Sequence, residues 1–479
     1  MKYFYSALLF IFLLQFSELN AQTQQALLNR TKHWRFGHKA GLDFNMQTGV
    51  PSVFNGSNGI VREGNSCISD TLGNLLFYCT GDTVWNKNHQ MMMNGAGMPS
   101  DKITILNSVI IPRPGNTNQY FIFINECINN SPAPNGKLKY SLIDMTLDGG
   151  NGAVVLGQKN IPVFHHTLNN LAFTKHGNGI DYWLAYSEKD PPYYLCMIPV
   201  ISSGPDTTNR VVSTYTGSLG FGRFSPANTL FASTSYEVFQ FNSNTGAINN
   251  KINFPTDSFS NYTPFSCEFS PDSKKIYFSL YQGSGSHNII QQFDLSVYSA
   301  TAVTSSLYSF FDMPASYCSC SIGHLQLSPS GKIYIAKPGG TYPGDSIHII
   351  HKPNSLGAAC NYQYNALSLN SKACNYSLPI FPDYYFNNIP TLTSFNENTL
   401  IWDDTKIYPN PCDVSLVVNH HIINKYEYTI INQMGQVMKK NISDQLSSKI
   451  DVSNLNAGLY YLIVNSSTST ITKKIIINH

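Results

Sequence analysis

The sequence has few charged residues. Asp, Glu, Lys and Arg make up 12% of its 479 residues, whereas about 25% is usual in a soluble domain. The 30 Lys and Arg nearly balance the 28 Asp and Glu, which leaves a net charge of +2. A chain so weakly charged has no basic field to hold nucleic acid or an acidic membrane surface. We therefore expect no nucleic-acid partner.

Long apolar runs are also absent after the first residues. Residues 7–14 form an apolar run that follows Lys2, and Gln15 and later polar residues end it well before Ala21. A membrane anchor is the alternative, but spanning a bilayer takes about 20 apolar residues. The pattern predicts a signal peptide at 1–21, cleaved after Ala21, and no transmembrane segment after that cleavage.

Catalytic and ligand-binding signatures are missing as well. The sequence contains no G-x-S-x-G elbow, H-E-x-x-H helix, phosphate-binding loop, EF-hand series or C-x-x-C pair. The neighbours His165–His166 and His420–His421 would point to opposite faces of a strand, which favours surface histidines over a metal site. We predict no catalytic, cofactor-binding or metal-binding residue and no cofactor.

The ten cysteines suit an exported protein in which disulfides can form. Cys67 and Cys79 flank a turn and could face each other across a hairpin, and Cys318 and Cys320 would share one face of a strand. Each of them could equally be a small buried apolar residue. The sequence leaves the disulfide connectivity open.

Aromatic residues are plentiful. The chain has 29 Tyr and 28 Phe, and Asn, Ser, Thr and Gly fill the segments between them. Aromatic side chains suit a half-buried pleated surface, and the small polar residues suit turns. The composition therefore predicts an all-β protein.

One short pattern recurs along the chain. Residues 269–278 read FSPDSKKIYF, residues 224–233 read FSPANTLFAS, and residues 327–336 read LSPSGKIYIA. The apolar residue ends one strand, Pro cannot donate to a strand ladder, the polar residues make a turn, and the aromatic run begins a second strand. Each copy is thus a predicted hairpin, and weaker copies occupy 67–79, 111–124 and 171–186.

The hairpins recur at a regular spacing. Their second strands are expected to begin at Leu75, Tyr120, Tyr182, Leu230, Ile276 and Ile333, which leaves gaps of 45, 62, 48, 46 and 57 residues. Each gap holds a further strand, such as 238–241, 289–295 or 347–350. Four strands recurring every 40–50 residues or so are typical of β-propeller blades. Six hairpins predict at least six blades.

The two ends of this region suggest a seventh blade. Three strands are expected at 34–37, 41–45 and 51–54, before the first hairpin, and a strand without followers at 378–386. Pairing the two ends would complete a blade and remove open sheet edges. A six-bladed ring with a separate N-terminal hairpin remains the alternative.

The segments WRFGHKAGLDFN, ISDTLGNLLFYCTGDTVWNKNHQ and LPIFPDYYF resemble the propeller region of large Bacteroidota surface proteins. The resemblance covers about 34–388. It implies a WD40-like β-propeller and no known activity.

The C-terminal part differs in character. Residues 389–405 are polar, without strong alternation, and predict a linker, and short alternating strands follow over 406–479. This last segment resembles the type IX secretion C-terminal sorting domain of Bacteroidota. The matching landmarks are Tyr408-Pro409-Asn410-Pro411, Gly435, Leu455, Gly458-Leu459-Tyr460 and Lys473-Lys474. The resemblance implies a small Ig-like β-sandwich, handling by the type IX machinery, and export through the periplasm, followed by surface attachment or release.

Two classes of function fit these features. The first is a binding, adhesion or scaffold protein with an unknown glycan or protein ligand, and loop residues such as Tyr193, Tyr194 and Tyr342 could contact that ligand. The second is a secreted hydrolase or lyase whose acid and base groups lie in the propeller funnel. The expected inner strands carry mostly Ser, Asn, Gly and Cys. Arg223, Glu268 and His324 are exceptions, and their scarcity favours the binding class.

Overall fold

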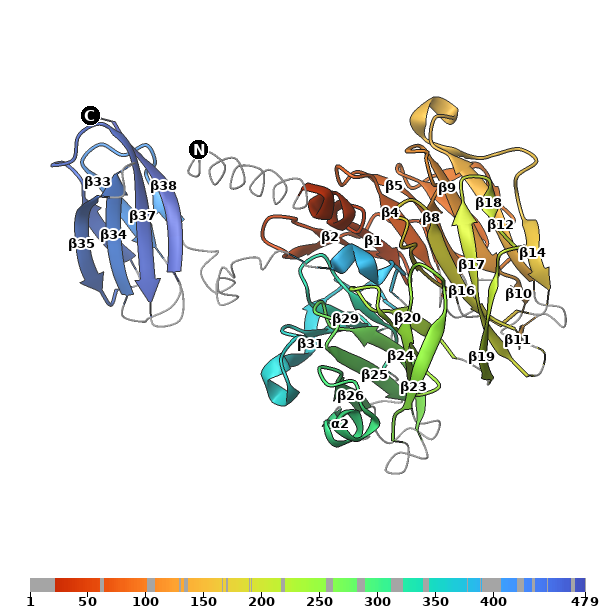
Figure 1. Cartoon of the computed structure of the whole chain (residues 1–479). Coiled ribbons are helices and arrows are strands. Elements are labelled where there is room, and N and C mark those ends of the chain that lie inside the picture. The colour runs from red at the N-terminus through yellow and green to blue at the C-terminus, as the bar shows by residue number, and fades with distance from the viewer. Residues whose placement is uncertain are drawn as a thin grey trace, which may run out of the picture. The chain divides into compact units, whose positions relative to one another are not determined.

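The computed structural model describes residues 22–60, 64–100, 108–128, 131–132, 137–165, 167–168, 171–188, 190, 192–216, 220–255, 262–281, 289–311, 322–338, 344–376, 378–387, 389, 406–419, 426–432, 436–445, 447–466 and 470–478. The chain forms two compact units, Met1–Pro390 and Thr391–His479. Both are built almost wholly from strands, which confirms the all-β prediction (Figure 1).

The strands of the first unit fall, within the described residues, into seven successive antiparallel groups. The first two groups are β1 (His33–Phe36), β2 (Ala40–Phe44) and β3 (Pro51–Val53), then β4 (Ser66–Ser69), β5 (Leu75–Cys79), β6 (Thr83–Asn86) and β7 (Met91–Ala96). The third group is β8 (Ser108–Pro112), β9 (Gln119–Asn125), β12 (Lys137–Asp144) and β14 (Ile161–His165). The strand β13 (Ala153–Val154) links β12 to β7, and β10 (Cys127–Ile128) pairs with β11 (Ser131–Pro132).

Four further groups follow in chain order. The fourth is β15 (Ala172–Lys175), β16 (Tyr182–Ser187), β17 (Tyr194–Ile201) and β19 (Val211–Thr216), with β18 (Gly204–Pro205) beside β17. The fifth is β20 (Gly222–Phe224), β21 (Leu230–Ser233), β22 (Glu237–Phe241) and β23 (Ile248–Asn253). The sixth is β24 (Thr263–Phe269), β25 (Lys275–Tyr281), β26 (Ile289–Asp294) and β27 (Tyr308–Phe311). The seventh is β28 (Leu325–Leu327), β29 (Ile333–Ala336), β30 (Ser346–Ile350) and β31 (Tyr362–Ser368).

Helices are short in the described part of the first unit. Residues 22–29 are helical. The other helical segments are α2 (Ala300–Ser305) and the 3-10 turns η1 (Asp148–Gly150), η3 (Gly357–Cys360) and η4 (Asp383–Phe386).

The predicted hairpins are present at the predicted places. The strands β5, β16, β21 and β29 begin at the residues expected from the repeat, and β9 and β25 begin one residue earlier. The first strand of each group contacts the first strand of the next, from β1 to β28. The strands β24, β25 and β26 of one group can be followed side by side in Figure 1.

The serine of the repeated Ser-Pro pair fastens each turn. Ser270 Oγ accepts a hydrogen bond from the Lys275 backbone N–H at 2.8 Å, and Ser225 Oγ accepts from the Leu230 N–H at 3.0 Å. Three residues after the serine the backbone turns left-handed, with φ of 60° at Ser273 and 59° at Asn228. Side chains that bond nearby backbone groups favour such turns over continued strand. The repeat therefore encodes a self-contained strand reversal.

The two ends of the first unit meet by packing. The ring of Trp34 on β1 lies 5.5 Å from Tyr334 on β29 and 5.9 Å from Phe381. One backbone bond, from His38 N–H to the Ala373 carbonyl at 2.8 Å, accompanies this contact. The first and last groups thus share one apolar core, in which Trp34 and Tyr334 are fully buried.

The prediction of a strand at 378–386 is wrong. This segment is irregular up to Pro382 and then forms η4, and the group β1–β3 has no fourth strand from it. Pro379 and Pro382 have no N–H to donate to a ladder, which explains why strand pairing fails here. The segment instead lies against the inner strands, because η4 contacts both β15 and β20.

The second unit is a pair of facing sheets. One contains β32 (Lys406–Tyr408), β33 (Ser415–Asn419) and β36 (Ser447–Asp451), and the other contains β35 (Val437–Ser443), β34 (Tyr426–Asn432), β37 (Gly458–Ser466) and β38 (Thr470–Ile477). Its core is apolar and includes Leu416, Ile430 and Leu462. This is the arrangement expected of a small β-sandwich.

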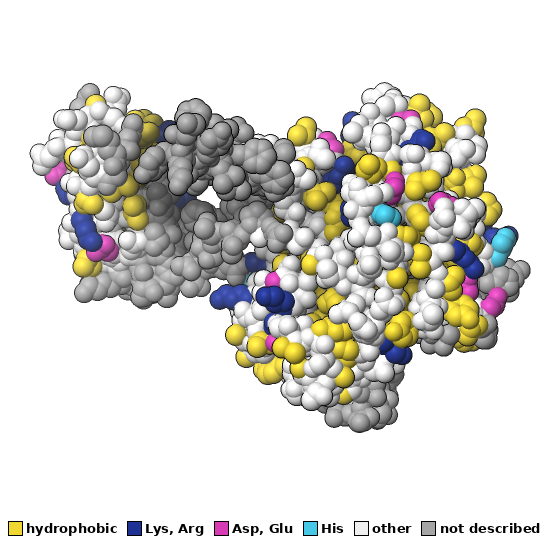
Figure 2. Space-filling model, viewed as in Figure 1, with side chains coloured by type: hydrophobic (Ala, Val, Ile, Leu, Met, Phe, Trp, Pro, Cys, Tyr) yellow, Lys and Arg dark blue, Asp and Glu magenta, His cyan; other side chains and the backbone are white. Residues whose placement is uncertain are grey.

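The surface reflects the low charge of the sequence. On the face shown in Figure 2, Lys, Arg, Asp and Glu side chains are scattered singly or in small groups among uncharged atoms. No large area of one sign is visible on that face.

Candidate functional site

The three charged or titratable residues expected on inner strands come together. Arg223 lies on β20, Glu268 on β24, and His324 directly before β28. Arg223 Nη2 lies 3.4 Å from Glu268 Oε2. All three side chains are buried, with at most 3% of each exposed.

Arg223 is surrounded by oxygen atoms. It donates to Gln326 Oε1 at 2.8 Å and to the carbonyl oxygens of Phe381 at 3.0 Å and Leu325 at 3.2 Å. Its Nη1 lies 3.5 Å from Oδ1 of Asp383, the first residue of η4. The guanidinium therefore joins β20, β24 and β28 to the irregular segment 378–386.

Burial raises the pKa of both carboxyl groups of this cluster. The neighbouring Glu268 raises the pKa of Asp383 further, to well above its usual range. For Glu268, the positive charge of Arg223 and the N–H groups of Phe269 at 3.0 Å and Leu327 at 2.9 Å, which donate to its carboxylate, oppose the rise. Arg223 therefore lies between two buried carboxyl groups, and its charge favours the anionic form of both.

His324 completes the cluster as a neutral group. Burial and the positive charge of Arg223 lower the pKa of His324 well below its usual value. Its ring lies 4.8 Å from that of Phe221. Carboxyl groups and a histidine are residues that serve in acid–base chemistry, but these side chains are buried. Through Arg223 the cluster ties β20, β24 and the residues of β28 together.

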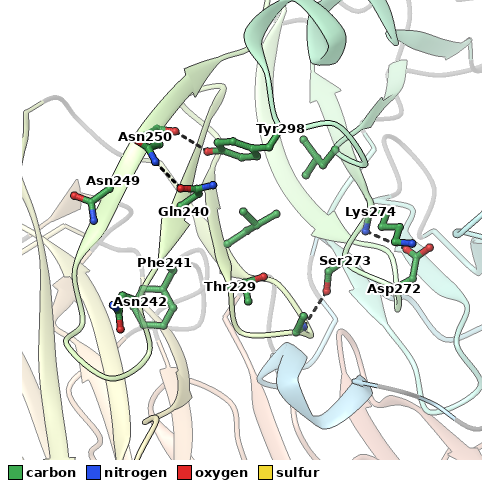
Figure 3. Close-up of a pocket in the computed structure, with 13 residues that line it drawn as sticks. Thr229, Gln240, Phe241, Asn242, Asn249, Asn250, Asp272, Ser273, Lys274 and Tyr298 are labelled. Atoms are coloured by element: carbon green, nitrogen blue, oxygen red, sulfur yellow. Dashed lines mark hydrogen bonds between the residues drawn. The ribbon is translucent and has the colours of Figure 1, made fainter.

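An open groove lies elsewhere, between the fifth and sixth groups of strands (Figure 3). Its volume is about 560 Å³. Most of its lining residues are polar and uncharged, and Leu230 and Leu295 add apolar side chains. The lining residues are Ala227, Thr229, Leu230, Gln240, Phe241, Asn242, Asn249, Asn250, Asp272, Ser273, Lys274, Leu295 and Tyr298.

Hydrogen bonds between the two groups hold this groove at opposite ends. Tyr298 follows β26 in the sequence, and its hydroxyl group lies 2.8 Å from the Asn250 carbonyl oxygen on β23. At the other end, the Ala227 N–H donates to Ser273 Oγ at 2.9 Å, which joins two of the repeated turns. Figure 3 shows both bonds. These bonds fix the fifth and sixth groups to each other on both sides of the groove.

The repeated turn and an irregular strand supply the groove's polar groups. The pairing of β22 with β23 shifts register between Val238 and Gln240, and Asn250 has a left-handed φ of 50°. There Asn250 Nδ2 donates to Gln240 Oε1 at 2.5 Å. A non-glycine residue at positive φ within a strand is uncommon and often marks a functional position. Sequence reasoning missed this groove, although three Asn in the strand INNKIN are an unusual choice for a β-strand.

The other residues singled out in the sequence are dispersed. Cys67 and Cys79 are buried free thiols, and so are Cys196, Cys267, Cys360, Cys374 and Cys412. Tyr193 is 36% exposed and Tyr194 is half-buried. His165 is exposed, and the described residues contain no group of three His, Cys, Asp or Glu placed to hold a metal. The signal peptide and residues His166, Cys318, Cys320, Tyr342, His420, His421 and Gly435 lie outside the described residues.

The landmarks of the C-terminal segment have clear structural roles. Asn410 Nδ2 donates to the Lys474 carbonyl at 2.9 Å, and Asn410 Oδ1 accepts from the Ile476 N–H at 2.9 Å. Asn410 therefore satisfies backbone groups at the edge of β38. Leu455 belongs to the core, and Gly458 begins β37.

Residues 406–478 match the family described as secretion system C-terminal sorting domain. No curated protein sequence matches the chain at a significant level. Among solved structures, it is similar to PorZ, a surface component of the type IX secretion system of Porphyromonas gingivalis, with 8% identity and a TM-score of 0.30. It is also similar to the extracellular domain of BT4673, a hybrid two-component system protein of B. thetaiotaomicron, with 14% identity and a TM-score of 0.45.

Each similarity covers 94% of this chain, and the chain spans 60% of the solved PorZ chain and 56% of the solved extracellular domain of BT4673. Similarity at this level carries no argument about the function of the chain. The match to the sorting domain, in contrast, indicates a specific export route. The chain is a protein that the type IX system of Bacteroidota exports to the cell surface or the surroundings. Among the described residues, no helix has both the length and the apolar character needed to cross a membrane.

Proposed function

We propose that the chain is an exported binding or adhesion protein that contacts a glycan or protein through its first unit. The observation that carries this proposal is the contrast between the two polar sites. The groove between the fifth and sixth groups is open and already formed, whereas the cluster around Arg223 is buried. A surface protein whose accessible site offers uncharged polar groups is suited to contact.

We also propose that the first unit is a seven-bladed propeller, over 34–388, between a signal peptide at 1–21 and a linker at 389–405. The contact of β1 with β4 and the packing of Trp34 on Tyr334 support seven blades over six. Both contacts put the group β1–β3 between the second and the last groups, as a blade would be. Residues 406–479 are the domain that addresses the chain for export.

Processing can be tested on the protein recovered outside the cell. Intact-mass analysis is expected to give a chain that starts at Gln22 and lacks the segment from about Lys406 onward. Deleting Lys473–His479 removes most of β38 and should leave the protein in the periplasm. A full-length chain outside the cell would contradict the processing, and normal export of the deletion would contradict the role of β38.

Binding can be tested with the full chain on glycan and protein arrays, beside a screen for glycosidase, esterase and peptidase activity. We expect a bound glycan or protein and no turnover. The hydrolase alternative rests on Glu268 and Asp383, and it requires the segment 378–386 to move so that solvent reaches them. Turnover that Glu268→Gln abolishes would establish that alternative and overturn the binding proposal.

A further inference from the structure

We infer that the groove between the fifth and sixth groups binds a neutral oligosaccharide. This inference rests on the proposed binding function and names the class of ligand and the residues that recognise it. It starts from the charges in the groove. Asp272 and Lys274 are its only charged lining residues among those that the structure describes, and they have opposite signs. A groove without net charge selects neither an anionic nor a cationic ligand.

The uncharged walls present amide groups. Gln240, Asn242, Asn249 and Asn250 all line the groove, and each side-chain amide carries two donors and one acceptor oxygen. A sugar hydroxyl donates one hydrogen bond and accepts others, so adjacent hydroxyls match adjacent amides. Gln240 and Asn250 are such a neighbouring pair, joined by one 2.5 Å bond.

Part of the amide capacity stays unused within the described residues. The Gln240–Asn250 bond engages one oxygen and one nitrogen, and no bond links Gln240 Nε2 or Asn250 Oδ1 to another described side chain or backbone group. The exposed Asn249 follows Ile248 at the start of β23 and adds a third amide to the same wall (Figure 3). Three amides with open donors and acceptors form a concentrated site for hydroxyl groups.

Apolar side chains also line the groove. Leu295 is 6% exposed, and the half-buried Leu230 packs against the same core cluster. A sugar ring has C–H faces as well as hydroxyl edges, so it can cover these leucines while its hydroxyls meet the amides. Tyr298 forms part of the rim and is fixed by its hydroxyl to the Asn250 carbonyl.

The size and rigidity of the groove also suit this ligand. Its volume of about 560 Å³ lies within the range of roughly 300–1,000 Å³ that is usual for small-molecule sites. The Tyr298–Asn250 and Ala227–Ser273 bonds fix the two groups of strands relative to each other. A site whose two sides are fixed to each other loses less conformational entropy on binding than a site with mobile sides.

The experiment uses the full chain and two single substitutions, Gln240→Ala and Asn249→Ala. The matched control is Asn253→Ala, since Asn253 is an exposed asparagine on the same strand but does not line the groove. All three side chains are exposed, so folding should be unchanged, and thermal unfolding checks this. The probes are an array of neutral glycans and then maltohexaose, cellohexaose, xylohexaose and mannohexaose by calorimetry, with hexagalacturonate as the acidic counterpart.

We expect at least one neutral oligosaccharide to bind and hexagalacturonate not to. Each groove substitution should weaken binding about tenfold, the effect of losing one hydrogen bond, and Asn253→Ala should leave it unchanged. Equal binding by all variants, or a preference for the acidic probe, would overturn the inference while leaving a glycan-binding protein. Binding of proteins alone would overturn the inference but keep the proposed function, and binding of neither glycan nor protein would overturn both.

Discussion

The two units of the chain differ in the kinds of side chain that they bury. In the described part of the second unit the buried side chains are apolar, apart from Thr429 and Ser448. The first unit buries Arg223, Glu268, Asp383 and His324 in one cluster, and His348 elsewhere. A small sandwich satisfies its backbone within strand ladders. The first unit brings several first strands and an irregular segment together at one place, where carbonyl groups such as those of Phe381 and Leu325 accept hydrogen bonds from a side chain.

The largest expected effect comes from opening the closure of the first unit. A chain that begins at Gly59 after its signal peptide lacks Trp34 and Phe44, which pack on Tyr334. We expect the first unit to lose its cooperative unfolding transition and to become protease-sensitive throughout, because the last group then exposes its apolar face. The second unit should keep its own transition in calorimetry. If the shortened chain melts like the parent, the first and last groups are not mutually stabilising.

Arg223→Met is the next largest change. It leaves the Glu268 carboxylate buried without its cation, which should lower the free energy of unfolding of the first unit by about 3–5 kcal/mol. The measurement is denaturant unfolding followed by the fluorescence of Trp34, Trp85 and Trp183. Adding Glu268→Gln should recover part of the loss.

The control for Arg223→Met is Lys251→Met. Lys251 pairs with Glu237 at 2.9 Å on the surface, and losing such a pair should change stability by about 1 kcal/mol or less. Equal effects of the two substitutions would mean that the buried cluster has no special role in the first unit.

Acid should lower the stability of the first unit more than that of the second, because the first unit contains the buried His348. Burial lowers the pKa of His348 from 6.5 to about 3, and its Nδ1 accepts the Asn365 N–H at 2.9 Å. The unfolded chain therefore binds a proton below pH 6.5 that the folded chain refuses, so stability is lost as the pH falls from 6.5 towards 3. Between pH 7 and pH 4.5 this single group should cost the first unit about 3 kcal/mol.

The substitution His348→Gln tests that assignment. Glutamine cannot titrate and can still accept a hydrogen bond, so the acid limb of the first unit should become flatter, while the second unit should not change. The described residues of the second unit contain no histidine. An unchanged slope in His348→Gln would assign the acid sensitivity to other groups.

The smallest effects on stability are expected from removing, in each unit, one side chain that hydrogen-bonds to backbone groups. Ser270→Ala removes the acceptor for the Lys275 N–H, and Asn410→Ala removes both bonds to the edge of β38. Each should cost about 1 kcal/mol, since a backbone group loses its partner. Separate melting transitions would show that Ser270→Ala shifts only the first unit and Asn410→Ala only the second. A shift of both transitions by either variant would contradict their independence.

Much of the fold could be predicted because the information is local. The serine, the proline and a turn residue at positive φ lie within a few positions of each other. The short segments that begin at Ser225, Ser270 and Ser328 are therefore enough to predict their hairpins. The segment 378–386 was predicted wrongly because its alternating apolar residues suit a strand, while Pro379 and Pro382 prevent one. Its true role depends on Arg223, which is far away in sequence and could not be inferred from the segment itself.

The Arg223 cluster and the groove also differ in how far the sequence alone could predict them. Arg223, Glu268 and His324 stand out as rare titratable residues on apolar strands, although their meeting with Asp383 required the tertiary structure. The groove gave a weaker signal. Gln240 and Asn249 resemble ordinary exposed strand residues, and only the unusual run of asparagines in β23 distinguishes them. The packing of the fifth group of strands against the sixth, and not any single motif, produces the groove.

The closure between Trp34 and Phe381 has a consequence for the order of events in the cell. Synthesis runs from the N-terminus, so Trp34 cannot pack against Tyr334 and Phe381 until nearly the whole first unit has been made. The export address at 406–478 follows soon afterwards. A chain cut short before Phe381 lacks both the closing segment and the sorting domain, so an incomplete first unit carries no signal for type IX export.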